Sequence, residues 1–173
     1  NAERTNDSEL ATTAYAAVAK GLTIASVEPG QYQRNPDPPF TTDTMLMKAG
    51  SDMGWNPRRT MKVAGELYNA GHITYMRTDS TRTNKGARED VKAHISKRWG
   101  EDHLGKGVLG PDAKSDAANV QDAHEAIRPT RPKIGSPEGL SAEQARLYRL
   151  IWARFAGSQM SPSRYERFSM TAQ

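Results

Sequence analysis

The sequence of 173 residues contains no cysteine, which excludes disulfide bonds and zinc sites built from thiolates. Apolar residues nowhere run together for the roughly 18 positions of a membrane-spanning helix, so we expect no membrane partner. Repeats and low-complexity tracts are lacking, and aromatic residues make up 7% of the chain. These features predict a cytoplasmic globular protein of one domain, or of one domain with pieces of a neighbour.

Basic residues outnumber acidic ones, which gives a formal net charge of +4 and a pI near 9.4. This balance favours a polyanionic partner such as nucleic acid. An ordinary soluble basic domain would carry the same charge, so charge alone leaves both interpretations open.

The stretch GHITYMRTDST at 71–81 combines a strand-like pattern with a plausible chemistry. In an extended chain Ile73, Tyr75, Arg77 and Asp79 would share one face. A phenol can attack phosphorus while a guanidinium on the same face holds the non-bridging oxygens. A Tyr-x-Arg pair in a half-buried strand is more often structural, so the pair by itself decides nothing.

Four segments resemble motifs of the type IA DNA topoisomerases, of the bacterial topoisomerase I kind, in the same order. They read RNPDPPFTT at 34–42, ITYMRTDST at 73–81, QDAHEAIRPT at 121–130, and LYRLIW at 147–152 with SQM at 158–160. Together they cover most of the chain beyond residue 30, which makes the resemblance specific.

The resemblance implies that Tyr75 attacks one DNA strand and forms a 5′-phosphotyrosine. Another strand would pass through the break before religation, which relaxes negative supercoils. The implied catalytic residues are Tyr75, Arg77 and His124, and the implied partners are single-stranded and negatively supercoiled DNA.

The resemblance also implies parts that this sequence does not show. In that family a toprim domain binds Mg²⁺ through an acidic cluster, and an arch domain adjoins the tyrosine domain. No strand-borne Asp-x-Asp is present, and Asp112, Asp116 and Asp122 lack that pattern, so no metal site is predicted. We therefore expect this chain to be inactive without a toprim domain.

Two further residues have open roles. Asp122-x-x-Glu125 reads as a capping box for a short helix limited by Pro129, which places His124 in a first turn that favours anions. His124 would grip a phosphate there, or would merely buttress the Tyr75 strand. Arg128 is either a phosphate contact or a tether for the proline turn.

Periodicity and end signals predict most of the secondary structure. The expected helices cover 8–20, a stretch from Thr41 or Thr42 to about 53, 57–71, 85–99 and a last helix from Ser141. Strands are expected at 22–27 and 31–34 around a Pro29-Gly30 turn, at the Tyr75 segment and in the C-terminal tail. On the helices, Tyr68 and Trp99 are assigned to inward faces.

The predicted fold is mainly α with a small β portion. Residues 40–160 would form a winged-helix or helix-turn-helix-like domain, although a plain helical hairpin explains the same pattern. Residues 1–39 would end the arch domain, and 161–173 would return a strand into it. Both ends look cut, as in a fragment of a larger protein.

DNA contacts are predicted from basic side chains near the tyrosine and on the third of the main helices, where a solvated face is the alternative. They are Arg58, Arg59, Arg77, Lys85, Arg88 and Arg128. Two other functions compete with the enzyme: a non-catalytic helix-turn-helix DNA-binding module with Tyr75 packed inside, and a hydrolase that uses His124 and Asp79.

Overall fold

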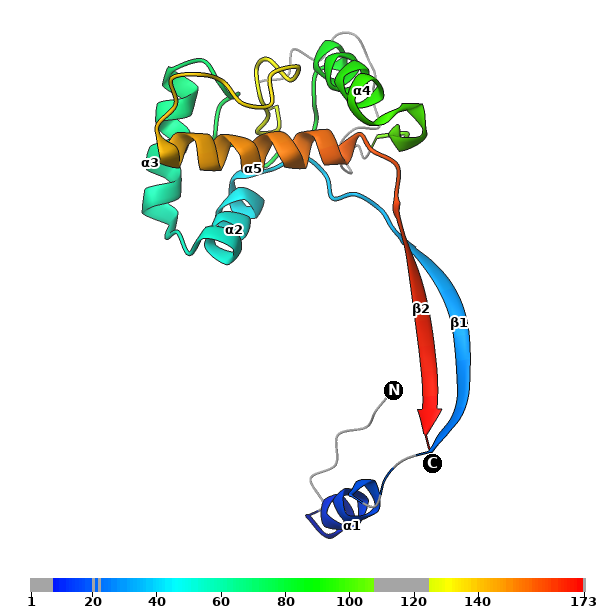
Figure 1. Cartoon of the computed structure of the whole chain (residues 1–173). Coiled ribbons are helices and arrows are strands. Elements are labelled where there is room, and N and C mark those ends of the chain that lie inside the picture. Colours follow the sequence, from blue (N-terminus) through cyan, green and yellow to red (C-terminus); the bar gives the residue numbers. More distant parts are fainter. Residues whose placement is uncertain (1–7, 20, 22, 108–124, 173) are drawn as a thin grey trace. The chain divides into compact units, whose positions relative to one another are not determined.

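A computed structural model describes residues 8–19, 21, 23–107 and 125–172. Its contacts divide the chain into two units (Figure 1). One comprises residues 1–33 with 164–173, and the other comprises residues 34–163. The two units are described separately.

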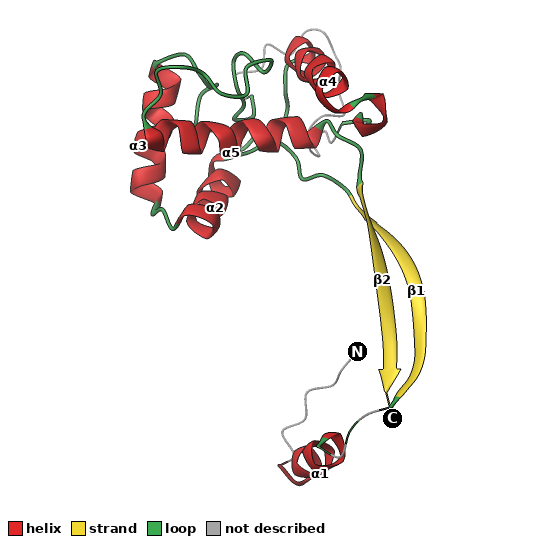
Figure 2. Cartoon of the chain, in the orientation of Figure 1, coloured by secondary structure: helices red, strands yellow, loops and turns green. Residues whose placement is uncertain are grey.

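The 34–163 unit is built from α-helices joined by irregular segments (Figure 2). Its elements are α2 (Thr42–Met53), α3 (Pro57–Asn69), α4 (Lys85–Trp99), the short 3₁₀ helix η1 (Glu101–His103) and α5 (Ala142–Ser158).

Each of these α-helices begins where a side chain can replace the missing intrahelical acceptor. Thr41, Asn56, Asn84 and Ser141 each accept a hydrogen bond from a backbone N–H in the first turn that follows. Pro57 occupies the first turn of α3, where no N–H is needed. The predicted starts of α2, α3, α4 and α5 are therefore confirmed.

α5 organises the core because each of its halves packs on different helices (Figure 1). Leu147, Tyr148 and Ile151, around its middle, join a buried cluster that includes residues of α2 and α3. Phe155 and Ala156 near its end pack with Ala87, Val91 and Ile95 of α4. All of these side chains are at most 8% exposed, so one helix ties the others together.

The other unit contains little buried surface. Its helix α1 (Ser8–Val18) has no buried residue. Strands β1 (Ile24–Arg34) and β2 (Ser163–Ala172) form a two-stranded antiparallel ribbon in which every residue of β1 is exposed. The division by contacts assigns their residues Arg34 and Ser163 to the 34–163 unit. Tyr32 and Tyr165 stack across the ribbon with ring centroids 5.0 Å apart.

The prediction of a turn at Pro29-Gly30 is wrong, because β1 runs through both residues without a break. A two-stranded ribbon leaves one edge of each strand unpaired, and proline, which has no N–H to donate, is tolerated at such an edge. The pairing partner is β2, from the far end of the chain, and the local sequence could not reveal it.

Other local predictions also fail, although the class, mainly α with a small β portion, is confirmed. The Tyr75 segment forms only an isolated bridge between Ile73 and Pro129 in place of a strand. Residues 125–128 are not helical, and Ile127 bridges to Phe40. Tyr68 and Trp99, assigned to inward faces, are 41% and 42% exposed.

Candidate active site around Tyr75

The backbone of the Tyr75 segment lies beside residues 126–130, which are distant in sequence. Thr74 N donates to Arg128 O at 2.9 Å, and Thr130 N donates to His72 O at 3.0 Å. The Thr74 hydroxyl also donates to Ala126 O at 2.7 Å. Because the segment has no regular sheet partner, these bonds satisfy backbone groups that a strand would pair by its ladder.

A second anchor comes from the start of α2. The Thr42 hydroxyl donates to Met76 O at 2.9 Å and accepts from Thr78 N at 2.8 Å. Thr42 N donates to Thr78 O at 2.9 Å. Tyr75 therefore lies between a residue held by the 126–130 segment and a residue held by α2, so its backbone is fixed on both sides.

The third anchor is the end of α3. His72 N donates to Leu67 O at 2.9 Å and Gly71 N donates to Tyr68 O at 2.8 Å, with Gly71 at a φ of 72°. This is the Schellman arrangement, which favours glycine because a side chain would be strained at that φ. It turns the chain sharply at the end of α3, ahead of Tyr75.

The side chains around Tyr75 alternate as predicted even though no strand forms. Tyr75, Arg77 and Asp79 are exposed, whereas Thr78 and Ser80 are buried. Ile73 departs from the pattern, since it is 1% exposed and belongs to the core. The phenol of Tyr75 is open to a substrate, with 49% of the residue exposed.

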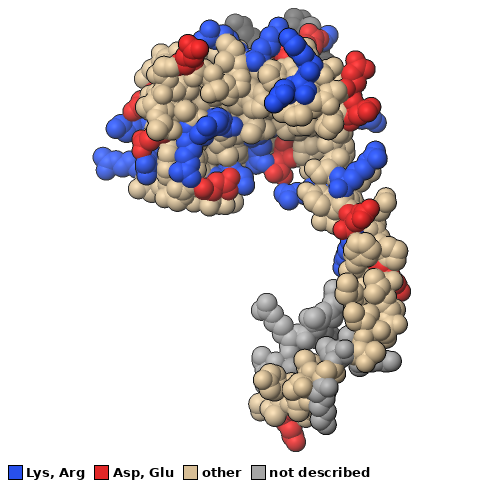
Figure 3. Space-filling model, viewed as in Figure 1, with Lys and Arg blue, Asp and Glu red and all other residues tan. Residues whose placement is uncertain are grey.

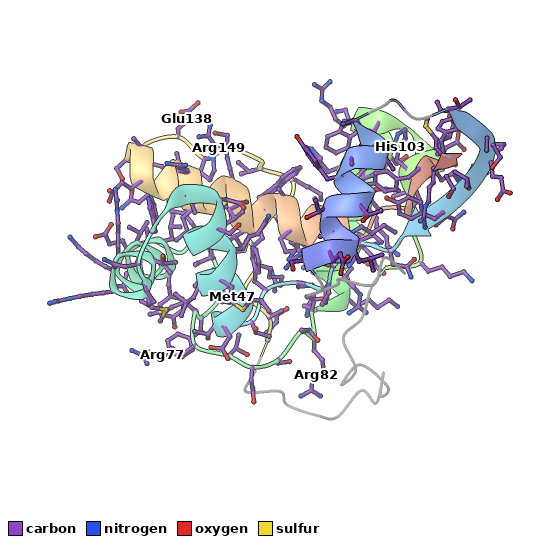
Figure 4. All side chains as sticks on the ribbon, turned by 90° about the horizontal axis from the view of Figure 1, so that it is seen from below. Met47, Arg77, Arg82, His103, Glu138 and Arg149 are labelled. Carbon is purple, nitrogen blue, oxygen red and sulfur yellow. The ribbon has the colours of Figure 1, made fainter. Side chains whose placement is uncertain are left out.

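Arg77 is placed to act on a ligand. Its side chain is exposed and projects away from the helices (Figure 4). It forms no hydrogen bond or ion pair with the residues that the structure describes. The Arg77 guanidinium is two residues from the exposed phenol of Tyr75, so an anion could bind between the two groups.

Arg128, by contrast, is committed to protein partners. It is 9% exposed, and its guanidinium pairs with both carboxylate oxygens of Glu125 at 2.6 and 2.9 Å. Its Nη1 donates to Pro129 O at 2.8 Å. These contacts favour the tether over the phosphate contact.

Glu125 does not cap a helix of its own. Besides pairing with Arg128, its carboxylate accepts a hydrogen bond from Asn84 N at 2.6 Å, at the start of α4. The adjacent Ala126 N donates to Arg82 O at 2.8 Å. Glu125 thereby connects α4 to the segment that borders Tyr75. His124, the residue before it, lies outside the described residues, as do Asp112, Asp116 and Asp122.

The remaining predicted DNA contacts have different surroundings. Arg58 is exposed, whereas Arg59 pairs with Glu143 and lies over the Trp55 ring at 4.6 Å. Lys85 lies 3.9 Å from Glu89, and Arg88 donates to Thr83 O. On the face in Figure 3, basic and acidic side chains are interspersed over the helical unit. Basic side chains therefore do not form one continuous patch on that face.

Sequence reasoning missed Thr42, Glu125 and Tyr68 as parts of this site. Tyr68 of α3 meets Tyr75 edge to face with ring centroids 5.2 Å apart. Thr42 and Glu125 lie inside the matched motifs, which was the one signal that could have identified them. Tyr68 carried no signal beyond being a tyrosine upstream of Tyr75.

The residues that the structure describes contain neither a group of metal-ligating side chains nor a membrane-spanning helix. Over residues 8–19, 21, 23–107 and 125–172, no three or more His, Cys, Asp or Glu side chains lie together in a way that could hold a metal ion. Within the same ranges no helix is long and apolar enough to cross a membrane.

Comparison with known proteins places these features in a family context. A family model described as DNA topoisomerase matches residues 1–173. DNA topoisomerase 1 type prokaryotic of Acanthamoeba polyphaga mimivirus is 44% identical over 82% of the chain and 16% of its own length. DNA topoisomerase 1 of Escherichia coli is 38% identical over 79% of the chain and 16% of its own length.

A solved structure gives the same result. Full-length topoisomerase I from Thermotoga maritima matches 99% of this chain with a TM-score of 0.74 and 31% identity, over 28% of its own length. The chain therefore spans 16% to 28% of the length of these relatives.

Proposed function

Because the chain belongs to the type IA DNA topoisomerase family, we propose that Tyr75 is the nucleophile that cleaves one strand of DNA. The reaction is the transient breakage of a single strand, passage of another strand through the gap, and religation, which relaxes negative supercoils. This chain contributes the tyrosine and its immediate surroundings to that reaction.

The chemistry begins with the phenolic oxygen of Tyr75. The phenol gives up its proton to solvent, and the phenolate oxygen forms a P–O bond to the phosphorus that stays on the 5′ side of the break. The bond from this phosphorus to the 3′ oxygen breaks, and that oxygen leaves with the electron pair and takes up a proton from solvent. In religation the 3′ hydroxyl loses its proton, attacks the same phosphorus and displaces the phenolate. A tyrosine ester stores the bond energy because a phenolate is a good leaving group.

Arg77 supports this step by charge. The guanidinium of Arg77 stabilises negative charge on the phenolate and on the non-bridging oxygens of the pentacoordinate phosphorus. We propose that His124 also stabilises negative charge on the phosphate. The reason is that His124 belongs to the same matched motif, QDAHEAIRPT at 121–130, as the residues 126–130 that border Tyr75.

The observation that carries the proposal is the contrast between a fixed backbone and an exposed side chain at Tyr75. Thr74 and Met76, on either side, are hydrogen-bonded to Arg128, Ala126 and Thr42. The phenol between them is 49% exposed. A nucleophile needs both a set position and access to its substrate. The exposure also weighs against the non-catalytic module, which required a packed Tyr75.

We propose that the Mg²⁺ site of the enzyme lies outside this chain. The described residues offer no acidic cluster for Mg²⁺. We assign Mg²⁺ to a toprim domain, beside an arch domain, in a longer polypeptide of the size of the relatives. Single-stranded DNA would contact Arg58, Lys85 and Arg88 in addition to Arg77, while Arg59 would first have to leave Glu143.

The test uses a chimera in which residues 1–173 replace the matching segment of Escherichia coli DNA topoisomerase 1. The chimera should relax negatively supercoiled plasmid with Mg²⁺, and the chain alone should not. Tyr75→Phe should abolish cleavage of a single-stranded oligonucleotide while its binding persists. Covalent cleavage product formed by the Tyr75→Phe chimera would overturn the proposal.

A further inference from the structure

We propose that Tyr68 is a positioning residue for Tyr75, holding the phenol in the orientation needed for attack. This inference rests on the proposed function, because it assigns Tyr68 a role only if Tyr75 is the nucleophile. The ring of Tyr68 contacts the ring of Tyr75 edge to face. The two ring centroids lie 5.2 Å apart, and the ring planes make an angle of 65°.

The local fold forces this contact. The Schellman turn at Gly71 ends α3 and turns the chain, and the bonds to residues 126–130 then fix its course. A Cβ built on Gly65 of α3 would lie 3.6 Å from Met76 Cε, so Met76 also packs over this helix. Gly65 and Tyr68 are three positions apart and share one face of α3. That face thus meets two successive residues of the Tyr75 segment.

Tyr68 does not serve the core in the way its neighbours do. Leu67 and Ala64 on the same helix are 0% exposed, whereas Tyr68 is 41% exposed. Its ring therefore lies at the surface, beside the half-exposed ring of Tyr75. With the backbone at Tyr75 fixed, the remaining freedom of the phenol lies in its side-chain torsions, and an edge-to-face neighbour restricts those torsions.

The expected size of the effect follows from the strength of such pairs. An aromatic pair favours its aligned geometry by a factor of roughly two to ten in population. The rate of cleavage should fall by a similar factor when the ring of Tyr68 is removed. The hydroxyl of Tyr68 should be dispensable, since the contact is between rings.

The first test measures the tyrosine side chains of the 173-residue chain by NMR. Tyr68→Leu should move the ring-proton signals of Tyr75, because the ring current of Tyr68 is lost. Tyr68→Phe should leave them near their original positions. Asn69→Ala, at the next and also exposed position of α3, is the matched control and should change nothing at Tyr75.

The second test measures single-turnover cleavage of an oligonucleotide by the chimera. Tyr68→Leu and a second non-aromatic variant, Tyr68→Gln, should each slow cleavage roughly two- to tenfold with oligonucleotide affinity unchanged. Tyr68→Phe should restore the parent rate to within about twofold. Parent-like cleavage by both non-aromatic variants, or an equal loss in Tyr68→Phe, would overturn the inference.

Failure of the proposed function and failure of the positioning role give different experimental results. If Tyr75→Phe still cleaves, the proposed function itself is wrong and Tyr68 has no nucleophile to position. If Tyr75→Phe does not cleave the oligonucleotide and the Tyr68 variants cleave it at the parent rate, only the positioning role of Tyr68 is wrong. A fall in thermal stability accompanied by weaker oligonucleotide binding would mark Tyr68 as merely structural, which also counts against the inference.

Discussion

The 34–163 unit and the ribbon with α1 differ in what stabilises them. In the 34–163 unit, residues such as Leu67, Ile127 and Ile151 are 0% exposed and pack into shared clusters. In the other unit, β1 is exposed along its whole length, and Val27 and Phe168 are 49% and 57% exposed. Two-stranded ribbons are marginal in water because they bury little apolar surface.

This difference explains why the candidate site is rigid. Tyr75, Thr42 and Arg128 all belong to the unit that has a core. A nucleophile there can be fixed by hydrogen bonds whose partners, such as Arg128 and Thr42, are buried or partly buried. The ribbon contributes none of the groups that we assign to the site. Four predictions test this contrast, from the largest expected effect to the smallest.

The largest effect should come from matched truncations in the two units. Ile127→Ala should lower the free energy of unfolding by about 2 to 5 kcal/mol, because it empties a fully buried position. Val27→Ala in β1 should change it by less than about 0.5 kcal/mol. Urea denaturation followed by circular dichroism measures both. A larger loss at Val27 would show that the ribbon carries the stability.

The next effect should come from the polar network beside Tyr75. Glu125→Gln removes the charge that faces the guanidinium of Arg128, which is 9% exposed. Leaving a buried cation unpaired should cost about 3 kcal/mol. The same urea titration measures it, with Glu138→Gln, at an exposed position, as the neutral control. Equal stabilities of the two variants would contradict the structural role of the pair.

The third effect depends on pH. Burial raises the pKa of Tyr148 to about 12, and its hydroxyl donates to Ile134 O at 2.7 Å. The unfolded chain therefore loses this proton at lower pH than the folded chain does. The contribution of the Tyr148 hydroxyl to the free energy of unfolding is therefore fully present below pH 10. As pH rises toward 12, the free energy of unfolding falls by about 2 to 3 kcal/mol.

Thermal melts of the parent chain and of Tyr148→Phe between pH 8 and 12 check this sign. The parent should lose stability faster than Tyr148→Phe above pH 10. Tyr15→Phe, at a position 76% exposed in α1, should follow the parent. Parallel curves for the parent and Tyr148→Phe would refute the shift.

The smallest effect concerns DNA. Arg77→Gln should weaken binding of a single-stranded oligonucleotide about two- to threefold, and should lower the slope of log K against log salt by about 0.7, as expected for one phosphate contact. Arg167→Gln makes the same charge change on the exposed ribbon and should have less effect. Fluorescence anisotropy at low salt measures both. A larger loss at Arg167 would place DNA on the ribbon.

The sequence predicted the helices best because their end signals are local. Asn56 followed by Pro57, and Ser141 followed by Gln144, place a cap acceptor at the correct distance from the first free N–H groups. Alternation also placed Tyr75, Arg77 and Asp79 on one side of the chain, because an extended chain turns successive side chains to opposite sides whether or not it joins a sheet. Whether that side is exposed did not follow from the sequence, since Ile73, assigned to the same side, is buried.

The failures share one cause, which is a partner distant in sequence. β1 passes through Pro29-Gly30 because β2 pairs with it, and residues 125–128 stay extended because Phe40 and Thr74 bond to them. For Arg128 the sequence left a phosphate contact and a tether open, and its ion pair with Glu125, which local sequence could not reveal, favours the tether. Tyr68 looked like a core residue because helical spacing cannot show that the chain turns at Gly71 and brings Tyr75 alongside.

The double role of the Thr42 hydroxyl has a mechanical consequence. One oxygen atom donates to Met76 and accepts from Thr78, so the start of α2 and the segment carrying the phenol behave as a single moving part. A shift of α2 would therefore displace the segment that carries Tyr75, whose other side is held at Thr74 by Arg128 and Ala126.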